Sequence, residues 1–154
     1  MDHANNDNNN NDILLYIYTG GRAPKHISTA IIDHSVRVID AEAFEGCRHL
    51  THVTFHDEVE RVDERAFQMC PSLQRIYFSS SSGVKVVKEG AFAFCTRLED
   101  IDEFAQELES IGANSFINCS SLRHVKIPSV KVIEANAFYM CVHLMDVEFG
   151  EGLE

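Results

Sequence analysis

Long hydrophobic runs are missing from this sequence of 154 residues. The longest apolar run near the N-terminus, ILLYIY at residues 13–18, has six residues and follows asparagine and aspartate instead of basic residues. A transmembrane helix needs about 20 apolar residues, and a secretory signal begins with a positively charged stretch. The sequence predicts neither, and we therefore expect an intracellular protein, cytoplasmic or nuclear.

Positive charge is scarce as well. The chain has 13 lysine and arginine residues against 24 aspartate and glutamate residues, which gives a formal net charge of −11. An acidic protein is repelled by the phosphates of nucleic acids and by anionic membrane surfaces. We therefore expect no nucleic-acid partner and no membrane insertion. Residues 1–12, MDHANNDNNNND, have almost no apolar side chains to bury and are expected to form a disordered Asn/Asp-rich tail.

The sequence also lacks the motifs of common catalytic and metal sites. It contains no Ser/His/Asp motif, no phosphate-binding glycine loop and no dinucleotide fingerprint. We therefore expect no enzyme activity, no catalytic residue and no cofactor. The five cysteines form no C-x-x-C pair, and no carboxylate or cysteine completes a site with His49, His52 and His56. These features predict no metal site.

An internal repeat is the main positive feature of the sequence. Several apolar columns recur together at steps of 22–25 residues, and units this short must stack to bury their apolar sides. The columns are Ile39, Val62, Val87, Ile111 and Ile133; Phe44, Phe67, Phe92, Phe116 and Phe138; Cys47, Cys70, Cys95, Cys119 and Cys141; Leu50, Leu73, Leu98, Leu122 and Leu144; and Val53, Ile76, Ile101, Val125 and Val147.

Each repeat is expected to contain two β segments and a short helical turn. The L-x-x-V-x-F spacing of residues 50–55 turns three side chains inward from a strand, VRVI at 36–39 suggests a second β segment, and AFEGC at 43–47 has room for about one helical turn. We predict an α/β repeat solenoid of about five units with a parallel β-sheet face and a second short β ladder. Residues 13–35 are assigned to an N-terminal cap and half-repeat, and residues 36–154 to the solenoid.

The recurring cysteine is predicted to be a core residue. A free cysteine is small, weakly polar and among the most often buried residue types. Because five is an odd number, the cysteines cannot all pair within one chain, and we expect reduced thiols. Disulfides between stacked cysteines under oxidising conditions are the alternative.

The third repeat departs from the pattern by one inserted residue. Its third inward strand position falls on Glu103, but the aromatic residue follows one place later, at Phe104. A β-bulge accommodates one extra residue. We expect a bulge that turns Phe104 inward and leaves Asp102 and Glu103 outside.

The pattern I-x-x-x-A-F-x-x-C-x-x-L-x-x-V-x-F, as in residues 39–55, resembles the BspA-type leucine-rich repeat. The resemblance covers about residues 27–154. It implies a solenoid with a parallel β-sheet on one face and a role in protein recognition or adhesion. It carries no catalytic residue over to this chain.

The outward positions of the main strands are the predicted binding surface. They group a tyrosine, an arginine and two histidines, residue types enriched at protein interfaces. We predict a non-catalytic recognition module that presents this rigid face to a protein partner. The candidate binding residues are His52, Arg75, Tyr77, Asp100, Asp102, His124 and Lys126.

The second β segment has an outward column that alternates in charge at every step. Opposite charges on neighbouring strands attract, and we interpret this column as a device that sets stacking register. It reads Arg37, Glu60, Lys85, Glu109, Lys131 and Glu154.

The alternative function is a structural or assembly unit, or a fragment of a longer array, that self-associates through its C-terminal end. The pattern reaches Glu154 without a polar cap, and an uncovered strand edge can pair with another chain. This predicts a homodimer through residues 141–154. The candidate self-association residues are Phe138, Val147, Phe149 and Leu153.

Overall fold

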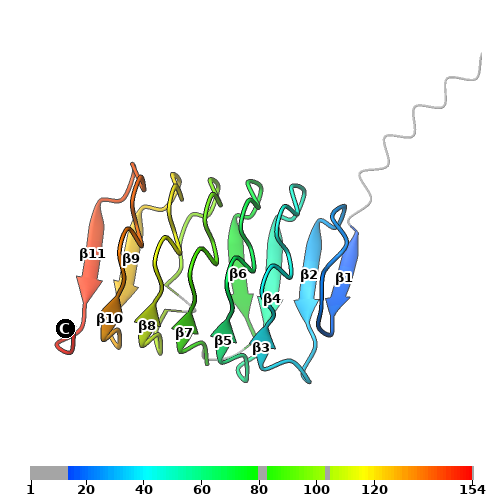
Figure 1. Ribbon diagram of the computed structural model, residues 1–154, viewed down its shortest axis with the longest axis horizontal. Helices are drawn as coiled ribbons and strands as arrows, with labels where there is room; N and C mark the ends of the chain where they lie inside the picture. The colour runs from blue at the N-terminus through cyan, green and yellow to red at the C-terminus, as the bar shows by residue number, and fades with distance from the viewer. Residues whose placement is uncertain (1–13, 80–82, 103–104, 154) are drawn as a thin grey trace, which may run out of the picture.

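The computed structural model describes residues 14–79, 83–102 and 105–153. The predicted tail and the predicted inward turn of Phe104 lie outside these residues. The described residues form short strands that stack along one axis as a solenoid (Figure 1), and they contain no helix that could span a bilayer. The strands are β1 (Leu15–Tyr18), β2 (Thr29–Ile32), β3 (Val38–Ile39), β4 (His52–Phe55), β5 (Arg61–Val62), β6 (Arg75–Phe78), β7 (Val86–Val87), β8 (Ser110–Ile111), β9 (His124–Ile127), β10 (Val132–Ile133) and β11 (Asp146–Phe149).

The main strands form the predicted parallel face, but as two sheets instead of one. One sheet has the order β1-β2-β4-β6, and the other pairs β9 with β11. Between them, the described residues of the third repeat contribute only an isolated bridge from Asp100 to His124. The Lys126 N–H donates to Oδ1 of Asp102 at 3.1 Å. The Asp102 side chain thus accepts a hydrogen bond that the backbone carbonyl of a neighbouring strand would accept in a regular ladder. The ladder of main strands is therefore interrupted in the described part of the third repeat.

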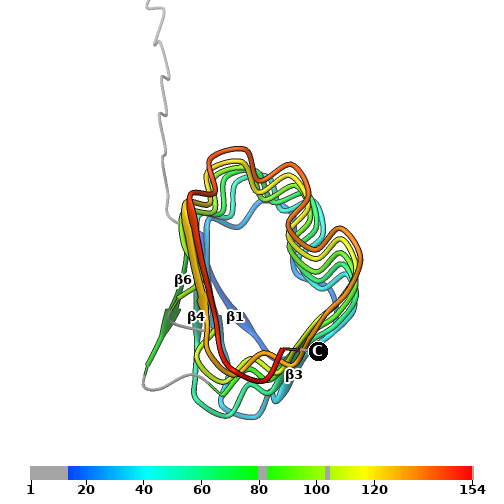
Figure 2. The same cartoon turned by 90° about the vertical axis from the view of Figure 1, so that its left-hand side faces the viewer.

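The second β ladder is continuous, as the repeat predicts. Its order is β3-β5-β7-β8-β10, with every neighbouring pair parallel. It lies across the coil from the main sheet (Figure 2). The alternating charges pair at both ends: Nη1 of Arg37 lies 3.7 Å from Oε1 of Glu60, and Nζ of Lys131 lies 2.8 Å from Oε2 of Glu109. The hydrogen bond from Lys131 lowers the pKa of Glu109.

The Ala-Phe-x-x-Cys segment is not helical, and the prediction of short helical turns is wrong for the described residues. Two positions in each repeat have a left-handed backbone; in the first repeat they are Glu42 (φ 59°) and Gly46 (φ 69°). Left-handed residues at this spacing prevent an α-helix. The backbone instead bonds between repeats, since the Phe44 N–H donates to Ala66 O at 2.7 Å.

The core is built from ladders of identical side chains. The five phenylalanines of the turn column stack with ring centroids 4.8–5.3 Å apart and planes within 5° of parallel. The cysteines form a second ladder beside them, and all five are buried and free. Cys95 shows the arrangement, because its thiol donates to the Phe67 carbonyl of the preceding repeat at 3.1 Å. The predicted core role of the cysteines is confirmed by this burial.

The first described strand extends both the sheet and the aromatic ladder. β1 pairs in parallel with β2, from Leu15 opposite Thr29 to Tyr18 opposite Ile32. The buried Tyr18 ring lies 5.0 Å from that of Phe44. We propose that this segment caps the stack.

Candidate protein-binding surface

The predicted binding residues on β4 and β6 form one group on the sheet face. The rings of His52 and Tyr77 stack with centroids 5.7 Å apart and planes 22° from parallel, and 41% of Tyr77 is exposed. Nη2 of Arg75 lies 3.3 Å from Oε2 of Glu99 in the next repeat. This group offers a partner an aromatic surface next to a charged pair.

The predicted residues on β9 form a second group, which is paired with β11. Nδ1 of His124 lies 3.2 Å from Oδ2 of Asp146, and Nζ of Lys126 lies 3.3 Å from Oε2 of Glu148. All four side chains are more than half exposed. The second group is therefore polar and charged, unlike the first.

The two groups do not lie on adjacent strands, because the third repeat separates β6 from β9. Asp100 and Asp102 lie in this interval and are half-buried. Asp102 holds the backbone of Lys126, so at least one predicted binding residue has a structural role. The expected grouping of exposed side chains from consecutive strands is thus only partly present.

Sequence reasoning did not identify two further features of the face. The side chains of Leu15, Ile17 and Ile31, on β1 and β2, are exposed, so the face is apolar near its first strand and charged near its last. The alternation of aliphatic and tyrosine residues in ILLYIY could have indicated that aliphatic side chains lie on the outer face. A polar groove of about 470 Å³ also borders the interrupted interval, lined by Glu99, Asp100, Ser121, Arg123, His124 and His143.

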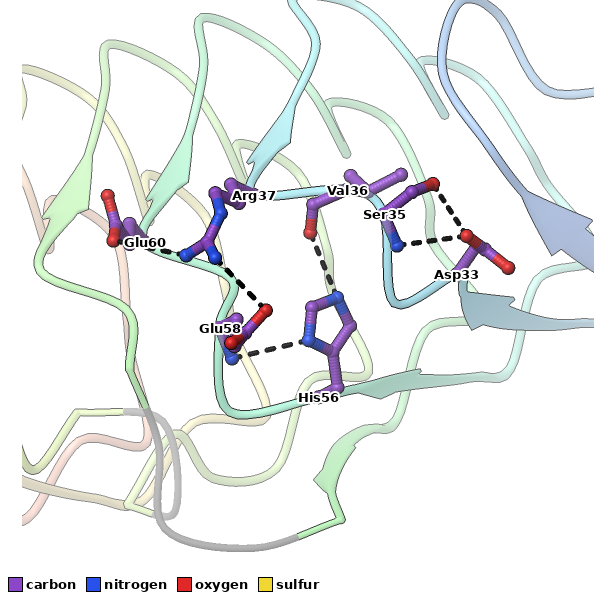
Figure 3. A network of polar contacts seen from close by, with 7 residues as sticks. All are labelled: Asp33, Ser35, Val36, Arg37, His56, Glu58 and Glu60. Atoms are coloured by element: carbon purple, nitrogen blue, oxygen red, sulfur yellow. Dashed lines mark hydrogen bonds and ion pairs between the residues drawn. The ribbon is translucent and has the colours of Figure 1, made fainter.

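The three closely spaced histidines lie in different environments. His49 is exposed and His52 is half-buried on the sheet face. Strict alternation after the inward Phe55 would place His56 outside, but His56 is only 2% exposed. Strand β4 ends at Phe55, and the alternation ends with it. Its Nε2 lies 2.9 Å from Val36 O (Figure 3).

The second ring nitrogen of His56 fixes its tautomer. Nδ1 accepts the Glu58 N–H at 3.2 Å (Figure 3), so the proton lies on Nε2 and is donated to Val36 O. Nearby, Nη2 of Arg37 lies 3.2 Å from Oε2 of Glu58. His56 is therefore a structural residue that joins two neighbouring repeats.

The predicted self-association residues lie in the last repeat. Val147, Phe149 and Leu153 are exposed, and Phe138 is half-buried. In the described chain, β11 pairs only with β9. The last repeat thus presents apolar side chains beside a strand edge.

Comparison with known proteins identifies the repeat. A profile of the BspA type leucine rich repeat region matches residues 23–151 in six copies. No curated protein sequence matches the chain. The structure is similar to that of a leucine rich cell surface protein from Faecalibacterium prausnitzii, with a TM-score of 0.73 and 32% identity over 83% of this chain and 34% of that one.

Two other solved structures are similar. The T. pallidum leucine rich repeat protein has a TM-score of 0.73 and 28% identity over 86% of this chain and 62% of that one. A leucine-rich repeat protein from Bacteroides ovatus has a TM-score of 0.60 and 29% identity over 79% of this chain and 37% of that one. The chain thus spans less than two thirds of the length of each of these proteins.

The expected intracellular location is contradicted by these findings. The F. prausnitzii protein with the same repeat is a cell surface protein. A composition without a visible export signal was a poor guide to the compartment. The profile covers most of the sequence, and the chain belongs to the BspA type leucine rich repeat family.

Proposed function

We propose that this chain is a non-catalytic recognition module that binds a protein partner at a cell surface through the outer face of its main strands. The observation that carries the proposal is the stack of the half-buried His52 on the exposed Tyr77, beside the ion-paired Arg75. Tyrosine and arginine are enriched among the residues that dominate binding energy. The apolar side chains of β1 and β2 extend this surface on one side.

Rigid presentation is the proposed mechanism. The strands are held by parallel pairing, and the turns are held by hydrogen bonds between repeats. A surface that is already ordered loses little conformational entropy when it binds. The charged pairs on β9 and β11 would then contribute orientation and association rate more than affinity.

Assembly through the last repeat is a second candidate. It is favoured by the exposure of Val147, Phe149 and Leu153 beside β11. The backbone N–H groups of Asn136 and Phe138 also have no acceptor in the described part of the chain. A second copy that covered these groups would supply both apolar contact and hydrogen bonds.

Capture from a surface-protein extract tests the proposed recognition face. The Arg75→Ala, Tyr77→Ala double variant should keep the melting temperature of the wild type but lose the proteins that the wild type captures. The matched control is Lys88→Ala with Glu89→Ala, two exposed residues away from the main sheet, which should leave capture unchanged. Equal capture by the two double variants would show that the outer face of the main strands is not the binding surface.

A further inference from the structure

A groove on the turn side of the coil is separate from the face proposed above. It has a volume of about 410 Å³ and is lined by Arg48, Met69, Pro71, Phe94 and Thr96. Its residues flank the buried cysteines of three successive repeats, and none of them belongs to a main strand. The groove therefore offers a partner a second, independent surface.

Two of the lining residues occupy an unfavourable backbone position. Met69 and Phe94 have φ values of 58° and 62°, in the left-handed region that glycine and asparagine tolerate best. Gly46 and Asn118 fill the same column in other repeats. Met69 and Phe94 are also 48% and 42% exposed, so core packing does not account for bulky side chains here. Met140, in the last repeat, has the same backbone conformation and exposure, so the feature that sets Met69 and Phe94 apart is that both line the groove.

The charge of the groove is the second indication. In the described ranges, neither Arg48 nor Arg97, which follows Thr96, forms an ion pair. Five other arginines do pair with carboxylates: Arg22, Arg37, Arg61, Arg65 and Arg75. In a chain with a net charge of −11, an unpaired arginine beside an apolar groove is complementary to a ligand that brings its own carboxylate.

We propose that this groove binds an extended peptide segment of a partner protein in which an apolar side chain stands next to an acidic residue. The apolar side chain packs between Met69 and Phe94 and against Pro71. The flexible thioether of Met69 adapts to apolar groups of different shape. The adjacent carboxylate accepts hydrogen bonds from the guanidinium of Arg48.

Three variants separate this site from a purely structural role. Met69→Asn with Phe94→Asn removes the apolar walls and places a residue that tolerates the left-handed backbone at both positions, so the melting temperature should stay equal or rise. Arg48→Glu reverses the charge without changing the turn. Met140→Asn is the matched control, because Met140 has φ 60° and is 52% exposed but does not line the groove.

The probe is an array of synthetic peptides with a central Leu, Phe, Met or Ser flanked by Asp or by Lys, followed by fluorescence polarisation of the peptides that bind. Wild type and Met140→Asn should bind apolar peptides flanked by Asp at least about tenfold more tightly than those flanked by Lys. The double Asn variant should lose at least about tenfold in affinity. Arg48→Glu should prefer the peptides flanked by Lys.

Three outcomes overturn the proposal. One is a wild type that does not distinguish the peptides. Another is a double Asn variant, or an Arg48→Glu variant, that binds as the wild type does. The third is self-association of the wild type that disappears in the double Asn variant, since this would assign the groove to a second copy of the chain.

Discussion

The ring of Phe92 lies 3° from parallel to that of Phe67, and their centroids are 5.1 Å apart. Each ring in this ladder contacts the equivalent ring of the neighbouring repeats. Stability in such a stack is close to a sum of repeat and interface terms. A defect in the middle should therefore affect the molecule differently from a defect at its end.

Phe92→Ala should destabilise the protein by about 3–5 kcal/mol, as expected for truncating a buried phenylalanine. Because Phe92 stacks on both Phe67 and Phe116, its loss should uncouple the two halves and broaden or split the urea unfolding transition. Tyr139→Ala, at an exposed position in the last repeat, is the control and should leave the transition single. An unchanged midpoint for Phe92→Ala would show that this ladder does not couple the repeats.

His56→Ala should cost about 1–3 kcal/mol, because it leaves the Val36 carbonyl and the Glu58 N–H without their buried partner. His52→Ala, on β4 and facing outward, should cost less. Urea unfolding of both variants provides the measurement. Similar losses in the two would mean that the hydrogen bonds of His56 do not stabilise the joint between repeats.

The cysteines should be inert to thiol reagents in the native protein. Burial raises the pKa of all five thiols, and most strongly those of Cys70, Cys95 and Cys119; only the thiolate reacts. Ellman's reagent at pH 8 should label them after unfolding, with Cys47 and Cys141 the first to react as the ends open. Rapid labelling of Cys95 in the folded protein would contradict this.

The same pKa shifts determine how stability depends on pH. The folded thiols have a higher pKa than unfolded ones, so their full contribution is present below about pH 8.5. It should be lost progressively as the pH rises above that value, because unfolding then releases protons. Urea midpoints measured from pH 7 to 10 should fall for wild type and fall less for Cys95→Ala. Equal falls in the two proteins would assign the alkaline loss to other groups.

The 154-residue chain should dimerise with increasing concentration if the last repeat is an assembly surface. Val147→Lys should weaken this association, because it places a charge among exposed apolar side chains. Ile31→Lys is the control, since Ile31 is exposed on β2, near the other end of the stack. Light scattering from low to high micromolar concentration checks the prediction, and a strict monomer throughout would reject it.

The ladders of inward side chains were predictable because the regular spacing of apolar residues can be recognised without knowing the local backbone conformation. Columns such as Phe44 to Phe138 repeat at one period, and only stacking buries them together. The turn conformation was not predicted. Glu42, Arg65 and Met69 have no preference for a left-handed backbone, yet they adopt it. The signal was present only in the same columns of other repeats, where Gly46, Gly90, Asn114, Asn118 and Asn136 occur.

The candidate site was less predictable than the core. Alternation correctly places Tyr77 and Lys126 outside, but the third repeat lies between their strands, so the two side chains are not neighbours. Alternation also fails at His56, where the strand has already ended. Surface position depends on where each strand stops, and that information is weaker in the sequence than the period of the core.

Site-specific photo-crosslinking shows whether a protein partner binds the outer face of the main strands. A photoreactive amino acid is introduced in place of Tyr77, or in place of Lys88 away from the main sheet, and each protein is irradiated with the partner that the wild type captures. If the partner binds this face, we expect it to crosslink to the protein at position 77 and not at position 88. Crosslinks from position 88 with none from position 77 would contradict it.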